Sequence, residues 1–393
     1  MNSFDIFLVV APGLEHVLAD EARAAGFAVT ETTRGGVTLR GGWPEVWRAN
    51  LVLRGPTRVL ARLGEFLAFH PAQLDKRARK FPWGEVLRPD VPVSVEVTTR
   101  ASKIYHAGAA RDRIETALRE ELGVRISPDA PVRVMVRIDD NRVTVSADTS
   151  GEPLHRRGAK LAVGRAPMRE TMAALFLRAC GHVPGEPVLD PMCGSGTFVI
   201  EAAEIAAGLA AGRGRDFAFQ HLATFDTGAW AAVKAAGSTL QAAAAPVAGQ
   251  RDAPATLPAD LSADLSGAPL CLGSDRDDGA VRSAAANAAR AGVAHLCRFE
   301  RRAISDLARP EGPPGLVIVN PPYGARIGER RLLFGLYAAL GEVMRTRFRG
   351  WRLGLVTSDE GLARATGLPL LPPGPPVAHG GLTVRLHRTG PLD

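Results

Sequence analysis

Cysteines and long apolar runs are both scarce in this sequence, and no cysteine lies close to another. The four cysteines among 393 residues provide neither a disulfide framework nor a Cys-x-x-Cys metal site; they are Cys180, Cys193, Cys271 and Cys297. No stretch approaches ~18 uninterrupted apolar residues, and residues 1–13 lack the basic segment and apolar core of a secretion signal. We therefore expect a soluble, cytoplasmic protein that binds neither a metal nor a membrane.

Length, apolar content and charge limit the number of domains and the kind of partner. A chain of 393 residues is too long for a typical single core, so two or three domains are expected. An apolar content of 46% excludes global disorder. The formal charge of +7 suits a polyanionic partner such as RNA, although a biased genomic composition explains the many arginines equally well.

Two short segments carry the main chemical signal. Residues 188–198 combine a short apolar strand, a glycine turn and the start of a helix, which is the context of a nucleotide-binding turn. Gly194 and Gly196 lack a Cβ, so the backbone there can pass close to a ligand. Residues 316–323 form an apolar strand that ends in Asn-Pro-Pro-Tyr. Because proline has no N–H, this strand end presents mainly acceptors, at the edge where open α/β sheets place chemistry.

Together these segments resemble motifs I and IV of class I S-adenosylmethionine-dependent amino-methyltransferases. Further stretches resemble, in the same order, the RNA guanine-N2 methyltransferases that carry an N-terminal THUMP domain; they are residues 102–106, 155–158, 166–170, 273–275 and 320–324. The resemblance spans nearly the whole chain. It implies an α/β protein with a C-terminal Rossmann-like methyltransferase domain, whose sheet is mostly parallel and doubly wound, with S-adenosylmethionine as cofactor and RNA as substrate.

Hydrophobic periodicity and the resemblance together predict the domain organisation. Residues 1–57 are expected to form a ferredoxin-like unit, residues 58–150 a THUMP RNA-binding domain, residues 151–165 a basic linker and residues 166–393 the methyltransferase domain. A flexible insertion is expected at about 209–268. Within it, residues 217–236 are apolar and aromatic enough to pack, whereas residues 242–268, rich in alanine, proline and aspartate, are expected to form a low-complexity excursion. The expected elements after residue 57 are strands 58–67, 92–99, 132–138, 142–147, 299–305, 352–357 and 382–386, and helices 71–80, 107–122, 168–180, 279–291 and 332–348.

The resemblance also implies a set of cofactor-binding residues. They are Glu170, Asp190, Met192, Cys193, Gly194, Gly196, Thr197, Asp275, Asp306 and Asn320. Asp275 is expected to accept hydrogen bonds from both ribose hydroxyls, or alternatively to cap a helix; the insertion explains why it lies about eighty residues after the glycines instead of ~20. Asp306 is expected to meet the adenine amino group, or to be a plain loop acid. Cys193 could be a nucleophile toward pyrimidine carbon 5, but its place inside the glycine turn favours a cofactor contact.

Basic residues gather in the region 58–170. Those predicted to contact RNA are Lys76, Arg79, Lys80 and Lys103 in the THUMP-like part and Arg156, Arg157 and Lys160 in the linker. No acidic residue interrupts the linker between Glu152 and Glu170, and a single sign of charge suits a phosphate backbone. Alternatively, each of these groups of basic residues forms a solvent-exposed face that contacts no RNA. His155 is expected to make a phosphate or structural contact rather than to act as a base.

Catalysis is assigned to Asn320, Pro321 and Tyr323. The exocyclic amine of guanine is a weak nucleophile, and the Asn320 side-chain oxygen and the Pro321 carbonyl can hold both of its hydrogens. Tyr323 would stack on the base once it has left its helix or loop. Asn-Pro-Pro-Tyr also occurs in DNA adenine and protein glutamine methyltransferases. The favoured function is guanine-N2 methylation of rRNA, with 23S rRNA as the preferred substrate. Methylation of tRNA and a non-catalytic role as an RNA-binding factor in ribosome assembly are the alternatives.

Overall fold

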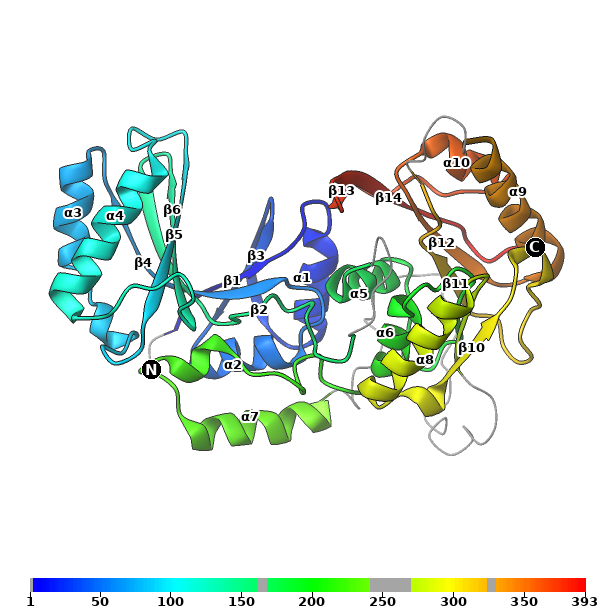
Figure 1. Ribbon diagram of the computed structural model, residues 1–393, viewed down its shortest axis with the longest axis horizontal. Helices are drawn as coiled ribbons and strands as arrows, with labels where there is room; N and C mark the ends of the chain where they lie inside the picture. The colour runs from blue at the N-terminus through cyan, green and yellow to red at the C-terminus, as the bar shows by residue number, and fades with distance from the viewer. Residues whose placement is uncertain (1–2, 161–167, 241–269, 324–329) are drawn as a thin grey trace.

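The computed structural model describes residues 3–160, 168–240, 270–323 and 330–393. Residues 161–167, the part of the predicted insertion from residue 241 on, and Gly324 lie outside these ranges. The molecule is elongated and carries one seven-stranded sheet in each half (Figure 1). In the part of the chain that is described, no helix is long and apolar enough to cross a membrane.

The N-terminal half begins with an antiparallel sheet of order β2-β3-β1-β4. Its strands are β1 (Phe4–Val9), β2 (Ala28–Thr33), β3 (Gly36–Gly41) and β4 (Arg58–Leu67), and its helices are α1 (Glu15–Ala24) and α2 (Trp43–Val52). Both helices are amphipathic, with Leu18 of α1 and Trp47 of α2 fully buried. The order of elements and strands is that of the predicted ferredoxin-like unit.

Strand β4 joins this unit to the THUMP-like part. Its first half pairs with β1, with Ala61 opposite Ile6, and its second half pairs with β7, with Leu67 opposite Arg142. The remaining elements are β5 (Val93–Arg100), β6 (Val132–Asp139), β7 (Arg142–Asp148), α3 (Pro71–Arg79) and α4 (Ala107–Ala117), continued by a turn of π-helix at Leu118–Leu122. Strands that the sequence divides between two units therefore lie in one continuous sheet.

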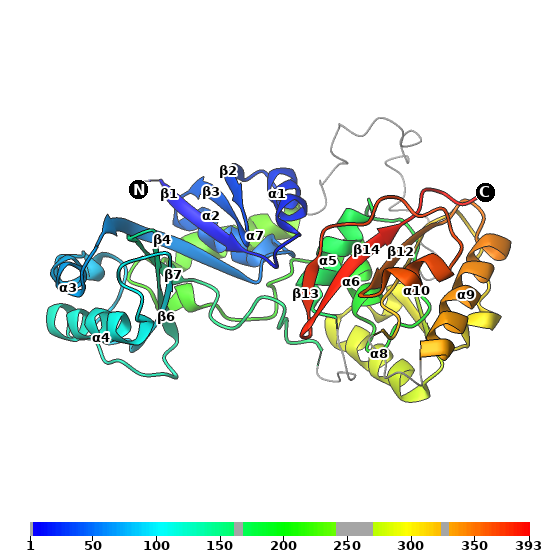
Figure 2. The same cartoon turned by 90° about the horizontal axis from the view of Figure 1, so that it is seen from above.

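The second sheet has the order β10-β9-β8-β11-β12-β14-β13, with the five strands from β10 to β12 parallel. Strands β12, β14 and β13 of this sheet are labelled in Figure 2. Its strands are β8 (Val188–Asp190), β9 (Cys271–Asp275), β10 (Cys297–Arg301), β11 (Leu316–Val319), β12 (Arg352–Thr357), β13 (Val377–His379) and β14 (Leu382–Arg388). Its helices are α5 (Glu170–Ala179), α6 (Thr197–Ala206), α8 (Asp278–Ala291), α9 (Arg330–Arg347) and α10 (Glu360–Ala365). The strand order reverses between β8 and β11, which is the switch point of a doubly wound sheet. The predicted fold class is confirmed.

Two details of the C-terminal half differ from the predicted elements or add to them. The strand predicted at 299–305 is β10, which ends at Arg301 and is followed by a 3-10 turn at Ile304–Asp306. A hairpin closes the sheet, because β13 and β14 are joined through Gly380 and Gly381, both with positive φ. Such a turn requires residues that tolerate left-handed backbone, which explains the glycine pair.

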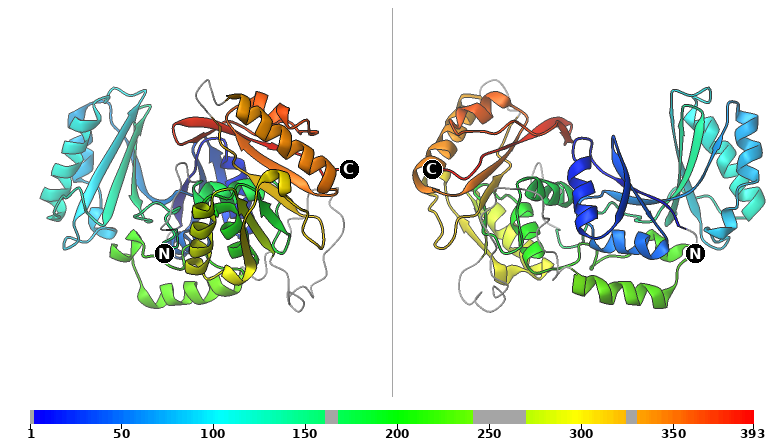
Figure 3. Two further views of the ribbon diagram at one scale, coloured as in Figure 1. Left: turned by 45° about the vertical axis from the view of Figure 1, so that its right-hand side comes forward. Right: turned by 180° about the vertical axis from the view of Figure 1, so that it is seen from behind.

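The segment after α6 leaves the methyltransferase sheet and returns to the N-terminal half. Helix α7 (Thr227–Leu240) runs along α2 (Figures 1 and 3). The rings of Trp47 and Phe219 lie 6.1 Å apart, and those of Phe219 and Trp230 lie 5.1 Å apart. The Ala223 N–H also donates to the Val86 carbonyl at 2.9 Å. The described part of the predicted insertion is therefore packed against both N-terminal units, whereas the excursion predicted at 242–268 lies outside the described residues.

Candidate functional site

Three polar side chains meet at the carboxyl edge of the second sheet. Asp190 ends β8, Asp275 ends β9, and Asn320 directly follows β11. These strands are neighbours, and the parallel registers pair Asp190 with Gly273 and Val188 with Leu316. Since the strand order reverses between β8 and β11, the three residues lie at the position where doubly wound sheets bind their ligands.

The glycine turn after β8 is held from several sides. The Gly194 N–H donates to Asp275 Oδ2 at 3.1 Å, the Cys193 N–H donates to the Ser274 carbonyl at 2.9 Å, and Asn287 Nδ2 on α8 donates to the Ser195 carbonyl at 3.0 Å. These bonds fix the turn before any ligand arrives. Asn287 was not predicted from the sequence, because an asparagine within an alanine-rich helix has no motif of its own.

The two glycines of this turn serve different purposes. Both have positive φ, +51° at Gly194 and +82° at Gly196. A Cβ on Gly196 would lie 3.0 Å from the Cβ of Ala284, so this glycine permits close packing of α6 on α8. A Cβ on Gly194 would have no heavy atom within 4 Å. The open space beside Gly194 is what a backbone turn that approaches a ligand requires.

Asp275 does not cap helix α8. Its Oδ1 accepts from the Asp277 N–H at 3.0 Å, while Asp277 itself caps α8 by accepting from the Gly279 N–H at 2.9 Å. The capping alternative thus belongs to Asp277. Each Asp275 oxygen keeps a further lone pair. The half-buried carboxylate can therefore accept hydrogen bonds from a pair of ribose hydroxyls, which suits the predicted cofactor.

Burial controls the ionisation of Asp190 and Cys193. Asp190 is 3% exposed. Burial raises the pKa of its carboxyl to about 8; the charge of Asp275 adds to this rise, and the hydrogen bond from the Met192 N–H opposes it. Burial likewise raises the pKa of the Cys193 thiol well above its ordinary value. Because the thiolate is the reactive form, Cys193 is a poor nucleophile. Its position in the turn agrees with a cofactor contact.

The strand end at Asn320 carries a buried acceptor. Asn320 Oδ1 is buried and accepts no hydrogen bond from the described residues. An unsatisfied buried oxygen costs about 1–3 kcal/mol, so such atoms in a site are commonly reserved for a ligand. Tyr337 of α9, not predicted from the sequence, supports this segment: its hydroxyl lies 3.4 Å from the Pro322 carbonyl and 3.2 Å from Thr357 Oγ1.

The remaining residues that were predicted to take part in catalysis or cofactor binding differ in their surroundings. Pro321 is buried, and Tyr323 is half-buried, with burial raising its pKa to about 12, so its phenol stays neutral. Met192 is half-buried in the glycine turn. Asp306 is exposed, and its carboxylate accepts a hydrogen bond from Ser305 Oγ at 3.2 Å. The contact of Asp306 with adenine therefore stays a prediction.

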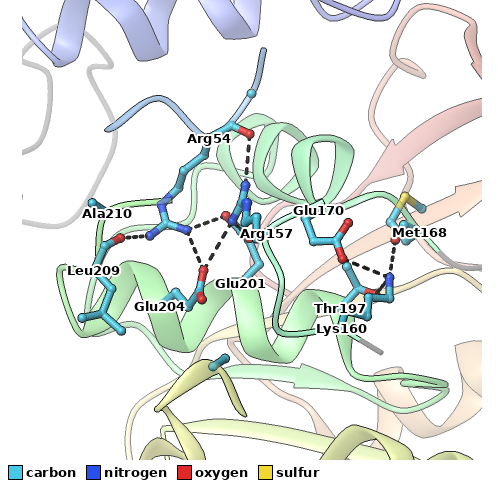
Figure 4. A network of polar contacts seen from close by, with 12 residues as sticks. Arg54, Arg157, Lys160, Met168, Glu170, Thr197, Glu201, Glu204, Leu209 and Ala210 are labelled. Carbon is cyan, nitrogen blue, oxygen red and sulfur yellow. Dashed lines mark hydrogen bonds and ion pairs between the residues drawn. The ribbon is translucent and has the colours of Figure 1, made fainter. Parts of the chain in front are cut away.

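Lys160 joins the linker to the first residues of two helices. Its ammonium donates to the Met168 carbonyl and to Thr197 Oγ1, both at 2.8 Å, and lies 3.4 Å from Glu170 (Figure 4). Thr197 begins α6 and Glu170 begins α5. The expectation that Lys160 contacts phosphate does not hold, because its side chain is 14% exposed and its three donors are engaged.

Two arginines and two glutamates form a buried ion cluster behind the glycine turn. Arg54, from the corner between α2 and β4, lies 2.7 Å from Glu201 and 3.3 Å from Glu204 of α6 (Figure 4). Arg157 is bonded to the same two carboxylates and donates to the Arg54 carbonyl at 3.1 Å. Burial alone would raise the pKa of Glu204, but the charges of Arg157 and Arg54 hold it below its ordinary value.

This Arg–Glu cluster corrects one prediction and adds a residue. Arg157 was expected to contact RNA, but its side chain is 6% exposed and ion-paired. Arg54 was not predicted. The sequence does contain a signal for it, since Glu201 and Glu204 lie three residues apart on an otherwise apolar helix and buried carboxylates need partners.

The other predicted RNA-binding residues are at the surface. Arg79 is held by Asp75 at 3.0 Å and by Glu120 and Glu121, so it joins α3 to the segment after α4 and is not free for phosphate. The exposed ones are Lys76, Lys80, Lys103 and Arg156. Their contact with RNA remains a prediction. His155 is half-buried among cations, with burial and the charge of Arg169 lowering its pKa to about 4.

This arrangement defines a class I methyltransferase: a switch point between β8 and β11, a glycine turn after β8, an acid after β9 and an acceptor after β11. Within the described ranges, no group of three or more metal-ligating side chains occurs. Residues 157–368 match the family described as RMKL-like, methyltransferase domain, and residues 5–60 match an RlmL ferredoxin-like domain. The chain belongs to the RMKL-like methyltransferase domain family, and its cofactor is S-adenosylmethionine.

Known proteins resemble the chain over most of its length. It is 38% identical to a "Ribosomal RNA large subunit methyltransferase K/L" of Syntrophotalea carbinolica and 33% identical to one of Methylococcus capsulatus, over 92% and 93% of this chain. The alignments cover 50% and 48% of those proteins, so the chain spans about half the length of these relatives. A crystal structure of a predicted N6-adenine-specific DNA methylase from Listeria monocytogenes shares 27% identity, with a TM-score of 0.84 over 100% of this chain and 97% of that one.

Proposed function

We propose that this protein transfers a methyl group from S-adenosylmethionine to the exocyclic N2 amine of a guanosine in RNA, and that this RNA is 23S rRNA. The observation that carries the chemistry is the buried, unsatisfied Oδ1 of Asn320 at the same sheet edge as Asp190 and Asp275. The names of the relatives, which align with nearly the whole chain, support rRNA of the large subunit as the substrate.

The cofactor would be held by the glycine turn and Asp275. The open side of Gly194 lets the backbone approach it, and Asp275 accepts hydrogen bonds from the ribose hydroxyls. Asp190 shapes the turn by accepting from the Met192 N–H at 3.0 Å. When bound, S-adenosylmethionine supplies a methyl group on a sulfonium sulfur, which is already a good leaving group.

The residues after β11 would act on the nucleophile. The amine of guanine gives its lone pair to the ring, so it attacks poorly unless its nitrogen becomes tetrahedral. Asn320 Oδ1 and the Pro321 carbonyl accept the two amine hydrogens and favour that geometry through orientation and electrostatics. As the nitrogen–carbon bond forms, the sulfur–methyl bond breaks, and the surplus proton leaves the nitrogen for solvent. Tyr323 offers a neutral ring on which the extruded base can stack.

A methyl-transfer assay with nucleoside mass spectrometry tests this proposal. The purified chain is incubated with S-adenosylmethionine and either 23S rRNA or tRNA from a strain that lacks the gene, and the RNA is digested to nucleosides. N2-methylguanosine should appear in the 23S rRNA, and Asn320→Ala should abolish most of it. N2-methylguanosine in tRNA alone would replace the rRNA substrate with the tRNA alternative. Cofactor binding without any methylated nucleoside would support a non-catalytic RNA-binding factor instead.

A further inference from the structure

Three loops of the THUMP-like part are joined at one end of the first sheet. The Ala68 N–H donates to the Asn141 carbonyl at 3.0 Å, the Lys103 N–H donates to Asn141 Oδ1 at 2.8 Å, and the Asn141 N–H donates to Ser102 Oγ at 3.0 Å. Asn141, whose φ is +62°, thus links the loop before α3, the loop before α4 and the turn between β6 and β7. These bonds hold the backbone of the loops in place.

These joined loops expose aromatic rings. Tyr105 is 81% exposed and Phe69 is 44% exposed. The Lys103 ammonium lies 5.7 Å from the centre of the Phe69 ring, which places the two loops against each other. The Tyr105 carbonyl accepts from Thr99 Oγ1 at 2.9 Å, so the ring projects from an anchored position. A largely solvated tyrosine on an anchored loop adds nothing to the core, and it loses little entropy when a partner covers it.

Cations accompany the two rings. Arg100 is 76% exposed at its side chain, and Lys103 is exposed. Arg100 lies 3.9 Å from Asp139, which is held more closely by Arg137 at 2.6 Å. Asp140 also lies in the turn. Rings beside cations match single-stranded nucleic acid, whose bases stack on aromatic faces while its phosphates meet positive charge. An apolar protein partner would favour a broader patch without charged groups at its centre.

We propose that Phe69, Arg100, Lys103 and Tyr105, here called the aromatic end, bind an unpaired segment of the RNA substrate. Bases stack on Tyr105 and Phe69, and phosphates contact Lys103 and Arg100. The inference rests on the proposed RNA methyltransferase function and adds the kind of RNA structure that is recognised. Helices α3 and α4 lie at the opposite end of the molecule from β10 to β12 (Figure 1). The aromatic end therefore positions the RNA at a distance and takes no part in methyl transfer.

Binding of two probes tests the stacking. The probes are a fluorescein-labelled single-stranded oligouridylate and a blunt RNA duplex of the same length. Tyr105→Ala should weaken binding of the single strand by roughly 5- to 100-fold and leave its salt dependence unchanged, because stacking releases no counterions. Tyr105→Phe should bind as the unmodified protein does, and binding of the duplex should not change. Lys103→Ala should instead reduce the slope of log K against log[salt] by about 0.7.

Leu67→Ala is the matched control. Leu67 ends β4, and its side chain is 47% exposed, close to the value for Phe69, but it has no ring. Unchanged binding of the single strand by Leu67→Ala supports stacking. A loss equal to that of Tyr105→Ala would overturn the proposal, because it would indicate a general apolar surface of the kind that a protein covers. Binding of the single strand by Tyr105→Ala at full affinity would overturn it as well.

Steady-state methyl transfer to RNA separates this inference from the proposed function. Tyr105→Ala and Phe69→Ala should raise KM for RNA and leave kcat near its original value, since the chemistry lies elsewhere. If the unmodified protein methylates RNA and both variants keep its KM, the aromatic end is not an RNA contact although the enzymatic function stands. If the unmodified protein transfers no methyl group to any RNA, the proposed function itself is wrong.

Discussion

The backbone N–H of Gly194 donates a hydrogen bond to the Asp275 carboxylate across 81 residues of sequence, at 3.1 Å. This bond connects the turn after β8 with the end of β9, and so joins the two parts of the proposed cofactor site. The same carboxylate has lone pairs left for ribose hydroxyls. Asp275 thus holds the turn in place and, in the proposed function, also contacts the cofactor.

Asp275→Ala should therefore weaken binding of S-adenosylhomocysteine by ~1–3 kcal/mol, measured by calorimetry, because ribose hydrogen bonds are lost and the turn is released. Asp277→Ala is the control at a neighbouring position. It removes the cap of α8 and should lower the free energy of unfolding by about 1 kcal/mol without a comparable loss of affinity. Equal affinity of Asp275→Ala and the unmodified protein would remove Asp275 from the cofactor site.

The sheet edge could be predicted from sequence because its signals are local. A glycine turn between a strand and a helix, an acid at a strand end and the Asn-Pro-Pro-Tyr run each identify themselves within about ten residues. The Arg–Glu cluster could not be predicted in this way, since Arg54 and Glu201 are 147 residues apart and nothing local distinguishes a buried arginine from a solvated one. For the same reason Arg157 was assigned to RNA on charge alone.

Long-range packing also explains the difference in domain organisation. The sequence places an insertion within the methyltransferase half and predicts that its aromatic part, residues 217–236, packs while its alanine-rich part, residues 242–268, is flexible. The structure shows which surface the aromatic part covers, because Phe219 packs on Trp47 of α2 and on Trp230. Aromatic residues indicate that a segment is buried, but not which surface buries it. Which surface buries these aromatic residues depends on the tertiary fold.

Loss of Arg54 should destabilise the protein strongly. Arg54→Met leaves Glu201 and Glu204 buried with fewer partners, so the free energy of unfolding should fall by ~3 kcal/mol, measured by urea denaturation. Arg364→Met is a matched control, because it breaks an exposed pair with Glu360 and should cost at most about 1 kcal/mol. The double variant Arg54→Met with Glu201→Gln should recover part of the loss. Equal stability of the two arginine variants would show that the cluster contributes nothing.

Asp190 should make the stability of the ligand-free protein depend on pH. The native carboxyl holds its proton up to about pH 8, whereas the unfolded chain releases it near 3.8. Between these values the native state binds more protons, so the free energy of unfolding falls as pH rises, with a slope that approaches ~1.4 kcal/mol per pH unit. Asp190→Asn cannot ionise and should lose this slope between pH 5 and 8. Parallel pH profiles for the two proteins would contradict the assignment.

The linker arginines should behave differently in RNA binding. Arg156 has a side chain 67% exposed and pairs with the exposed Glu152 four residues earlier, so it is free to exchange that partner for phosphate. Arg156→Ala should reduce the slope of log K against log[salt] by about 0.7 to 0.9 without altering stability. Arg157→Ala should instead lower the free energy of unfolding and leave the slope of the folded protein unchanged. A change of slope for Arg157→Ala and none for Arg156→Ala would reverse this assignment.

Asn320 provides the most direct test of the proposed chemistry, because its role predicts a particular pattern of loss. Its oxygen is expected to hold the target amine, so Asn320→Ala should keep its affinity for S-adenosylmethionine while single-turnover methyl transfer falls by ~10²- to 10³-fold, the scale for one preorganised polar group. Tyr323→Ala should instead weaken capture of the base by ~1–3 kcal/mol if the ring stacks on it. Asn320→Asp keeps an acceptor at the same position and should retain more activity than Asn320→Ala. If Asn320→Ala methylates RNA at the original rate with cofactor saturating, the amine is not held by Asn320, and the catalytic role proposed for the end of β11 is wrong.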